Sequence, residues 1–284
     1  MADFLTRAAN HNIHVILTWE LPNYGGDDPG PCTQFSDVNV INLCAGGVSV
    51  TVQFFHDLAQ GLIAQGSRLD AIFAYEVRNE YYYEPDAAPL NLTSGTVSAA
   101  DGQIYDMRST TSRQQMMDKG LTYFTDQVRA AIVALDPTAL VTVGFFWPQT
   151  PNPTRIGDPR VIEVYPAIAN STADFADLHA YPIVGELTLA QVVQNYGFMG
   201  YQQHKPVLMG EFGASQSDYP LISDAASVLQ NWQTGSCTYS FKGWLLWTWD
   251  TESPEQIPTF WAAISGDGSI SMALAPAVRS DPCQ

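Results

Sequence analysis

The sequence is poor in basic residues. Its 284 residues include only 12 lysines and arginines against 29 aspartates and glutamates, which gives a formal net charge of −17. No run of Lys or Arg offers a footprint for the phosphates of a nucleic acid or for an anionic membrane surface. We therefore predict that neither nucleic acid nor a membrane is a partner, and we interpret the acidity as a self-repelling surface.

Long hydrophobic runs and nucleotide-binding loops are missing as well. No apolar run is long enough to span a bilayer. No strand-like segment is followed by GxGxxG or a P-loop, and these loops are the usual signature of nucleotide binders that have open α/β sheets. Their absence argues against an open, nucleotide-binding sheet. We also predict that the protein has no cofactor.

The cysteines are few and widely spaced: Cys32, Cys44, Cys237 and Cys283. They lack CxxC spacing, so a zinc site or a thioredoxin-type motif is not indicated, and we predict no metal. Their even number favours disulfides, and local pairing would join Cys32 to Cys44 and Cys237 to Cys283. The alternative is four reduced, buried thiols in a cytosolic protein.

Two sequons for N-glycosylation begin at Asn91 and Asn170. Together with the cysteines and the low lysine content, they favour an oxidising, extracellular setting. The sequence has no recognisable signal peptide. We predict a secreted monomer whose signal segment lies upstream of Met1.

What the sequence does contain is a regular alternation of strand-like and helix-like segments. Hydrophobic residues make up 46% and charged residues 14%, enough for a large core. The expected strands lie within 12–20, 69–77, 139–147, 175–182, 205–213 and 241–250, and the expected helices within 1–13, 48–66, 114–135, 187–198 and 223–233. Such alternation predicts right-handed βαβ units and a parallel sheet.

Polar and aromatic residues gather at the carboxyl ends of these strands. They are Trp19, Glu20, Asn79, Glu80, Trp147, His179, Tyr181, Glu211, Trp247 and Trp249. A (β/α)8 TIM barrel would collect all of these ends around one mouth. We therefore predict an α/β barrel in one catalytic domain, 1–284, whose first two strands lie upstream of Met1; a complete but shorter α/β domain is the alternative. The segment 81–107, which is interrupted by prolines and glycines, is expected to be a long loop.

Two glutamates, Glu80 and Glu211, end separate strands. One such carboxylate alone usually caps a helix or pairs with an arginine such as Arg78. Two carboxyl groups, each at the end of a strand, are the smallest set of catalytic groups that glycoside hydrolysis needs. One of them is protonated and the other is ionised. Aromatic rings at neighbouring strand ends, including Trp19 and the tyrosine run 81–83, suit the C–H faces of sugars.

In combination these motifs resemble the retaining glycoside hydrolases of clan A, most closely glycoside hydrolase family 5, the cellulase and mannanase family. The resemblance covers the whole chain, from the family's strand three to its strand eight. Asn79-Glu80 matches the pair that ends strand four, and His179-Ala180-Tyr181 matches the His-x-Tyr of strand six. Glu211 in PVLMGEFG matches the nucleophile of strand seven.

The resemblance implies a role for each matching residue. Glu211 would be the nucleophile and Glu80 the acid/base, while Asn79 would bind the 2-hydroxyl of the sugar. Tyr181 would orient Glu211, and His179 would help to keep Glu80 protonated. Trp247, with Trp249 as its rival, would line the sugar subsite. The implied substrate is an oligo- or polysaccharide such as β-mannan, cellulose or a related β-glucan.

The sequence departs from the family pattern in three places. The family's strand-two arginine would lie before Met1, and the strand-three histidine has no equivalent because Trp19 and Glu20 stand there. The loop after strand four is unusually long. The segment 23–26 (NYGG) faintly resembles a loop of β-mannanases.

Two other readings stay open at this point. One is a carbohydrate-binding barrel that has lost catalysis. The other is a metal-dependent barrel hydrolase that uses His179 with Asp177, although metal barrels usually carry several histidines at their strand ends.

Overall fold

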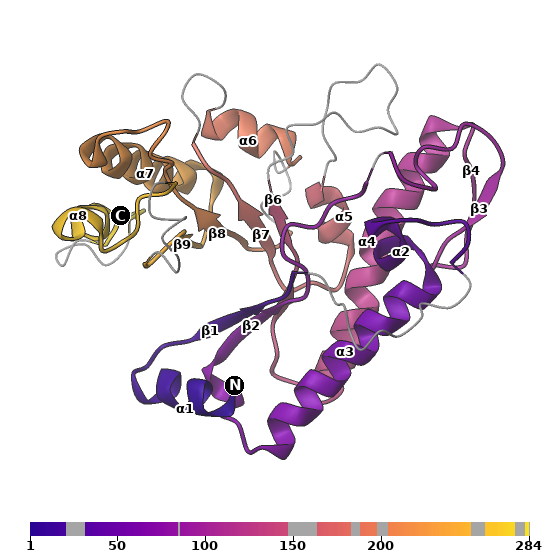
Figure 1. Ribbon diagram of the computed structural model, residues 1–284, viewed down its shortest axis with the longest axis horizontal. Coiled ribbons are helices and arrows are strands. Elements are labelled where there is room, and N and C mark those ends of the chain that lie inside the picture. Colours follow the sequence, from indigo (N-terminus) through magenta and orange to yellow (C-terminus); the bar gives the residue numbers. More distant parts are fainter. Residues whose placement is uncertain are drawn as a thin grey trace. The chain divides into compact units, whose positions relative to one another are not determined.

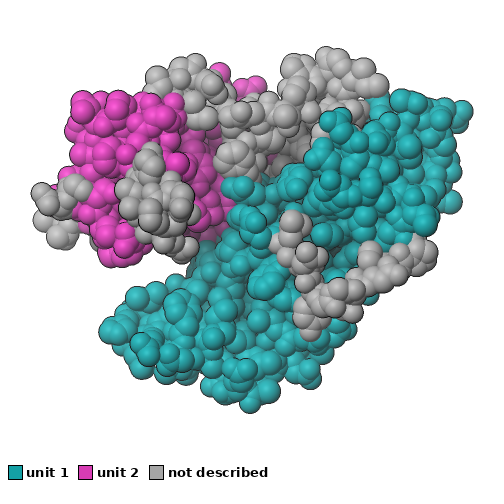
Figure 2. Space-filling model, in the orientation of Figure 1, with its two compact units in different colours: residues 1–176 teal, residues 177–284 magenta. Residues whose placement is uncertain are grey.

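The computed structural model describes residues 1–20, 32–84, 86–146, 164–182, 188–197, 204–250, 259–275 and 282–283. The chain divides into two compact units, Met1–Ala176 and Asp177–Gln284, which Figure 2 colours separately. Parallel strands accompanied by helices occur in both. The predicted α/β class is therefore confirmed, whereas closure into a barrel, the two upstream strands and a single domain over 1–284 stay predictions.

The first unit is built from βα segments and one hairpin (Figure 1). Its elements are α1 (Ala2–Asn10), β1 (Val15–Thr18), α2 (Val38–Leu43), α3 (Ala45–Ala64), β2 (Ile72–Glu76), β3 (Thr96–Ser98), β4 (Ile104–Asp106), α4 (Thr110–Val133), β5 (Val141–Thr142), β6 (Gly144–Phe146) and α5 (Val164–Asn170). The parallel sheet has the order β1-β2-β5. Among the described residues β1 pairs only with β2. Residues of β1 line a groove together with apolar side chains that include Phe4 and Leu58.

The second unit repeats the same architecture. Its elements are β7 (Ala176–His179, which begins at the unit boundary), α6 (Leu189–Asn195), β8 (Val207–Phe212), α7 (Ile222–Ser236), β9 (Gly243–Leu246) and α8 (Ser265–Leu274). Strand β8 lies between β7 and β9 and runs parallel to β9. Helices α7 and α8 pack against each other, as Figure 1 shows in orange and yellow.

Local sequence explains why the helices begin where they do. The side chain of Ser109 accepts a hydrogen bond from the Ser112 amide at the start of α4. A capping box joins Thr188 and Gln191 at the start of α6. Helix α4 then buries a stripe at helical spacing, made of Met116, Met117, Leu121, Phe124 and Val128.

All six predicted strand segments contain strands, and all five predicted helices form. The strand expected within 139–147 is interrupted at Val143, between β5 and β6. The segment 81–107, expected to be a long loop, does connect β2 to α4, and 96–106 within it forms the hairpin β3–β4. Its turn carries Gly102 at φ 78° after Asp101, and Asp-Gly between strands is a recognised hairpin signal. Helices α2, α5 and α8 were not predicted.

Both predicted disulfides are present. Cys32 is bonded to Cys44 and Cys237 to Cys283, and no free cysteine occurs among the described residues. The first bond ties the segment that precedes α2 to the start of α3, and the second ties the end of α7 to the C-terminal segment. In the described part of the chain, no helix combines the length and the apolar character needed to cross a membrane.

The two disulfides should contribute unequally to stability. Loop-closure entropy grows with the length of the closed loop, and the bonds span 46 and 12 residues. We expect replacement of Cys237 and Cys283 by Ala to lower the free energy of unfolding by about 4 kcal/mol, and replacement of Cys32 and Cys44 by about 3 kcal/mol. Urea denaturation of both double variants measures the two free energies of unfolding. A larger decrease for the variant that lacks the shorter loop's disulfide would contradict the prediction.

Candidate active site

Strand β2 delivers a polar segment to the carboxyl end of the first unit's sheet. Thr18 and Glu76 are register partners on β1 and β2, and the Thr18 hydroxyl donates to Glu76 Oε2 at 2.8 Å. Beyond the strand, the backbone N–H of Asn79 donates to the Trp19 carbonyl at 2.6 Å. The Asn79 side-chain amide donates to Glu20 Oε1 at 3.0 Å. Two strand ends are thereby joined next to Glu80.

Glu80 has a backbone conformation that is unusual for its residue type. Its φ is 45°, in the left-handed region that glycine occupies without strain. Hydrogen bonds on both sides hold it there: Gly144 N–H donates to the Arg78 carbonyl at 3.0 Å, and Tyr81 N–H donates to the Gly144 carbonyl at 2.8 Å. Strained non-glycine residues that survive under such constraints concentrate at functional sites.

Arg78 is a second unusual feature of this segment. Only 2% of it is exposed, and its Nε and Nη1 have no hydrogen-bond partner among the described residues. Burial lowers the pKa of Arg78, an effect partly offset by the neighbouring tyrosines and the carboxylate of Glu20. Its guanidinium lies 5.8 Å from the centre of the Tyr82 ring. The sequence suggested Arg78 as an ion-pair partner for a glutamate, and no such pair occurs in the described residues.

In the second unit, β8 carries Glu211 on an irregular stretch. Between Met209 and Phe212 the strand advances by three residues, while its partner β9 advances by two, from Trp244 to Leu246. One extra residue on one strand is a β-bulge, which commonly redirects a side chain next to an active site. The bulge therefore explains locally how a buried strand can present Glu211 at its end.

Two side chains from the end of β7 contact the Glu211 carboxylate. The Tyr181 hydroxyl donates a hydrogen bond to Glu211 Oε2 at 2.6 Å. His179 Nδ1 lies 3.5 Å from the same oxygen. The His179 side chain is 1% exposed, whereas that of Glu211 is 17% exposed. A buried histidine and a half-buried tyrosine thus hold a carboxylate that remains partly accessible.

Two glycines permit the close packing around this carboxylate. A Cβ on Gly213 would overlap the Trp247 carbonyl oxygen and crowd the Tyr181 ring. A Cβ on Gly210 would overlap the carboxylate of Asp177, which is buried. Both glycines of the GEFG motif are therefore required by neighbouring atoms.

The predicted aromatic residues have different environments. Trp247 and Trp249 are 40% and 70% exposed at the end of β9. Trp19 is half-buried, with its ring 4.1 Å from that of Phe54 on α3. Trp147 and the segment 23–26 lie outside the described residues.

The tyrosine run 81–83 contributes one exposed ring rather than three. Tyr81 and Tyr83 are buried, and burial raises the pKa of both hydroxyls above the usual value. The Tyr81 hydroxyl donates to that of Tyr83, which donates to the Met117 carbonyl at 2.7 Å. Only Tyr82 is exposed. The expectation that the whole run would face a sugar is therefore wrong for two of its members.

The predicted site residues fall into two groups, one in each unit. Asn79, Glu80 and Trp19 belong to the first unit. Within the second unit, His179 and Tyr181 meet at Glu211. Sequence reasoning missed the bond from Asn79 to Glu20 and the burial of Arg78, two of whose nitrogens have no hydrogen-bond partner among the described residues, since no pattern of spacing encodes such contacts.

Comparison with known proteins gives a clear answer for the fold. No protein-family profile and no curated protein matches the sequence. Among solved structures, an endo-1,4-β-mannanase from Rhizomucor miehei is similar over 95% of this chain and 72% of its own, with a TM-score of 0.57 and 17% identity. A GH5-4 broad specificity endoglucanase from an uncultured bacterium is similar over 96% and 74%, with a TM-score of 0.58 and 11% identity.

An endo-β-1,4-mannanase from Thermotoga petrophila gives the same result. It is similar over 97% of this chain and 61% of its own, with a TM-score of 0.59 and 12% identity. The α/β fold of the chain is thus similar to that of glycoside hydrolases that are TIM barrels. This likeness confirms the fold that the resemblance to clan A and family 5 implies.

The strain at Glu80 gives a testable consequence for stability. A left-handed conformation costs a non-glycine residue about 1–2 kcal/mol, and glycine has an entropic disadvantage of about 0.5–1 kcal/mol. We expect Glu80→Gly to raise the free energy of unfolding by about 0.5–1 kcal/mol, as measured by urea denaturation. Ser94→Gly, at an exposed loop residue without a positive φ, should instead be neutral or destabilising. A loss of stability in Glu80→Gly would refute strain at this residue.

Proposed function

We propose that this protein is a retaining glycoside hydrolase that cleaves β-linked glycans. The observation that carries the proposal is the hydrogen bond of 2.6 Å from Tyr181 to Glu211, at the strand end where the family motif has its nucleophile. Proteins of similar fold are named endo-mannanases and endoglucanases. We accordingly propose β-1,4-linked mannan or glucan as the substrate, and a monomer that is secreted and needs no cofactor.

In the proposed mechanism Glu211 is the nucleophile. Its ionised carboxylate attacks the anomeric carbon while the glycosidic C–O bond breaks. The Tyr181 O–H donates to Oε2, which favours the ionised form and fixes the carboxylate in one orientation. His179, beside the same oxygen, restricts its movement further. The other face of the carboxylate remains available to the sugar because Glu211 is partly exposed.

Glu80 is the proposed acid/base. It gives its proton to the leaving oxygen in the first step, and in the second it removes a proton from the water that attacks the anomeric carbon and releases Glu211. Retention requires the two carboxyl groups to lie about 5–5.5 Å apart, whereas inversion requires about 6.5–9.5 Å. The proposal therefore needs the two units to bring both glutamates to the same sugar. The anomer first released, observed by proton NMR, distinguishes the two outcomes.

The proposed subsite uses Asn79 and the exposed tryptophans. Asn79 is fixed by its bond to Glu20, so its amide has a defined direction next to the proposed acid/base. Trp247 and Trp249 offer indole faces at the end of β9, and an exposed indole can pack against the C–H face of a sugar ring. Trp19 remains a candidate of the same kind, although its ring packs on Phe54.

The roles of the glutamates predict distinct losses of activity. With β-mannan, cellulose and mixed-linkage glucan, Glu211→Ala should be inactive, and azide should restore turnover of aryl β-glycosides by giving the glycosyl azide of inverted configuration. Glu80→Ala should lose about 10²–10⁴-fold on polysaccharide. It should lose far less on aryl glycosides, whose leaving groups need no proton in the first step. Released reducing ends and aryl groups measure both effects.

Glu84→Ala serves as the matched control. The Glu84 side chain accepts a hydrogen bond from the nearby Asp86 amide and has no proposed role, while its bonds to Asn39 use backbone atoms that the substitution keeps. Activity that survives in Glu211→Ala without azide would disprove the nucleophile assignment. A parent protein that binds a glycan without cleaving it would instead support the carbohydrate-binding alternative.

Tyr181 should act through Glu211. A hydrogen bond to a charged group contributes about 1.5–3 kcal/mol, so Tyr181→Phe should lower kcat/KM by about 10- to 150-fold. Most of the loss should appear in kcat. Tyr239→Phe, just before β9 begins at the opposite strand end, should have unchanged kinetics. An equal loss in both variants would indicate a general effect on folding rather than on the carboxylate.

A further inference from the structure

Tyr82 is the one member of the tyrosine run that reaches the surface of the first unit. It is 45% exposed, whereas Tyr81 before it and Tyr83 after it are buried. Tyr82 follows the proposed acid/base, Glu80, by two residues, a stretch of chain that spans at most about 7 Å. The mechanism proposed above does not use this ring.

The backbone that carries the Tyr82 ring is held from below. The side-chain amide of Asn42, a fully buried residue of α2, donates to the Tyr82 carbonyl at 2.7 Å. On either side of Tyr82, the hydroxyls of Tyr81 and Tyr83 are hydrogen-bonded to each other at 3.1 Å inside the core. The segment under the exposed ring is therefore ordered before any ligand arrives, which lowers the entropic cost of binding.

A cation lies against the Tyr82 ring. The guanidinium of Arg78 is 5.8 Å from the ring centre, and arginine characteristically packs on aromatic faces in this way. Arg78 itself is buried, so this contact lies on the protein side of the ring. The ring is thus supported from within, while its exposed area remains available to a ligand.

The position of the ring indicates which part of a substrate it meets. An exposed aromatic ring can pack against the C–H face of a sugar. An acid/base gives its proton to the leaving oxygen, so it lies on the leaving-group side of the bond that breaks. We propose that Tyr82 binds the sugar on the leaving-group side of the cleaved bond. The inference rests on the proposed glycoside hydrolase function and uses residues of the first unit alone.

This binding residue narrows the class of substrate. A contact beyond the cleaved bond is made only by a glycan whose chain continues on the leaving-group side. Binding energy from that part of the substrate can be used to lower the barrier at the reacting bond. We therefore expect the enzyme to prefer chains with a leaving sugar over substrates with a small leaving group.

The test compares substrates that have and lack a leaving sugar. Mannohexaose and cellohexaose have sugar units beyond the cleaved bond, whereas β-mannobiosyl fluoride and β-cellobiosyl fluoride release only fluoride. We expect Tyr82→Ala to lower kcat/KM on the hexaose that the parent cleaves by about 3- to 10-fold, as the loss of one aromatic contact implies. The kcat/KM on the matching fluoride should be unchanged. Tyr82→Phe, which keeps the ring, should behave as the parent on both substrates.

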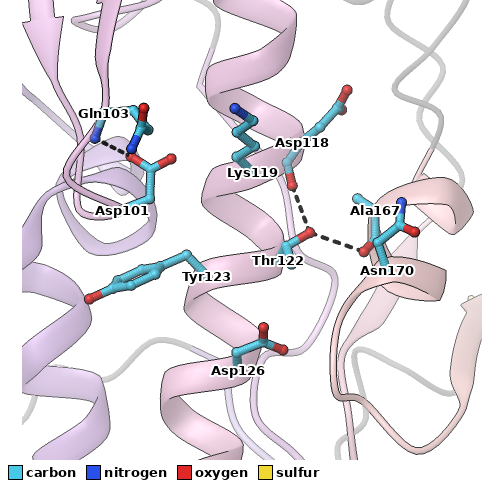
Figure 3. A pocket seen from close by; sticks show the side chains of 9 residues that line it. All are labelled: Asp101, Gln103, Asp118, Lys119, Thr122, Tyr123, Asp126, Ala167 and Asn170. Carbon is cyan, nitrogen blue, oxygen red and sulfur yellow. Dashed lines mark hydrogen bonds between the residues drawn. The ribbon is translucent and has the colours of Figure 1, made fainter.

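Tyr123→Ala is the matched control. Tyr123 is a half-buried tyrosine on α4 in the same unit, and it lines a pocket of about 560 Å³ that shares no residue with the candidate active site (Figure 3). This variant should keep the kcat/KM of the parent on both substrates. Equal losses on hexaose and fluoride in Tyr82→Ala would overturn the proposal, and so would equal losses in the two variants. Because Tyr82 is exposed, its truncation should leave the fold intact, and Tyr82→Gln gives a second variant without a ring.

The outcomes separate this inference from the proposed function. If the parent cleaves a hexaose and Tyr82→Ala cleaves it equally well, the role of Tyr82 is rejected and the hydrolase stands. If the parent cleaves no glycan, the hydrolase is rejected, and calorimetric titration with the two hexaoses then decides on Tyr82. Affinity about 3- to 10-fold weaker in Tyr82→Ala would support a sugar contact. Equal affinity, or no binding to the parent, would overturn it.

Discussion

Parallel pairing of buried strands is the constraint from which the rest of this structure follows. It directs the carboxyl ends of β1 and β2 to the same edge of one sheet, and those of β8 and β9 to the same edge in the other unit. Only at such an edge can Glu80 and Glu211 be partly exposed while the strands that carry them are buried. The hydrogen bonds from Tyr181 and within the Asn79 segment depend on that alignment.

Much of this arrangement could be predicted from the sequence. Apolar runs that end in polar residues located all six strand segments, because a strand covered on both faces must be apolar and can be polar only where it emerges. The same logic picked out Glu211, Tyr181 and His179, which do meet in the structure. The even count and local spacing of the cysteines likewise gave the correct pairing.

What the sequence could not reveal are features fixed by tertiary contacts. The positive φ of Glu80 arises from pairing with Gly144, which is 64 residues away, and the bulge at Glu211 arises from the register of β9. Arg78 is buried although two of its nitrogens have no hydrogen-bond partner in the described residues, and a charged group is usually buried only when it is paired. The sequence suggested that Tyr81 and Tyr83 would pack against a sugar. In the structure the Tyr81 ring packs against Phe124 in the core, and the Tyr83 hydroxyl donates a hydrogen bond to the Met117 carbonyl.

The two glycines beside Glu211 leave its carboxylate little freedom to move. Neighbouring atoms leave no room for a Cβ at Gly210 or Gly213, so the backbone on both sides of Glu211 is held close to Asp177 and to Trp247. The Tyr181 hydroxyl then reaches Glu211 Oε2 from a fixed direction. Because these groups are already in place in the folded protein, little reorganisation is needed when the charge at this carboxylate changes.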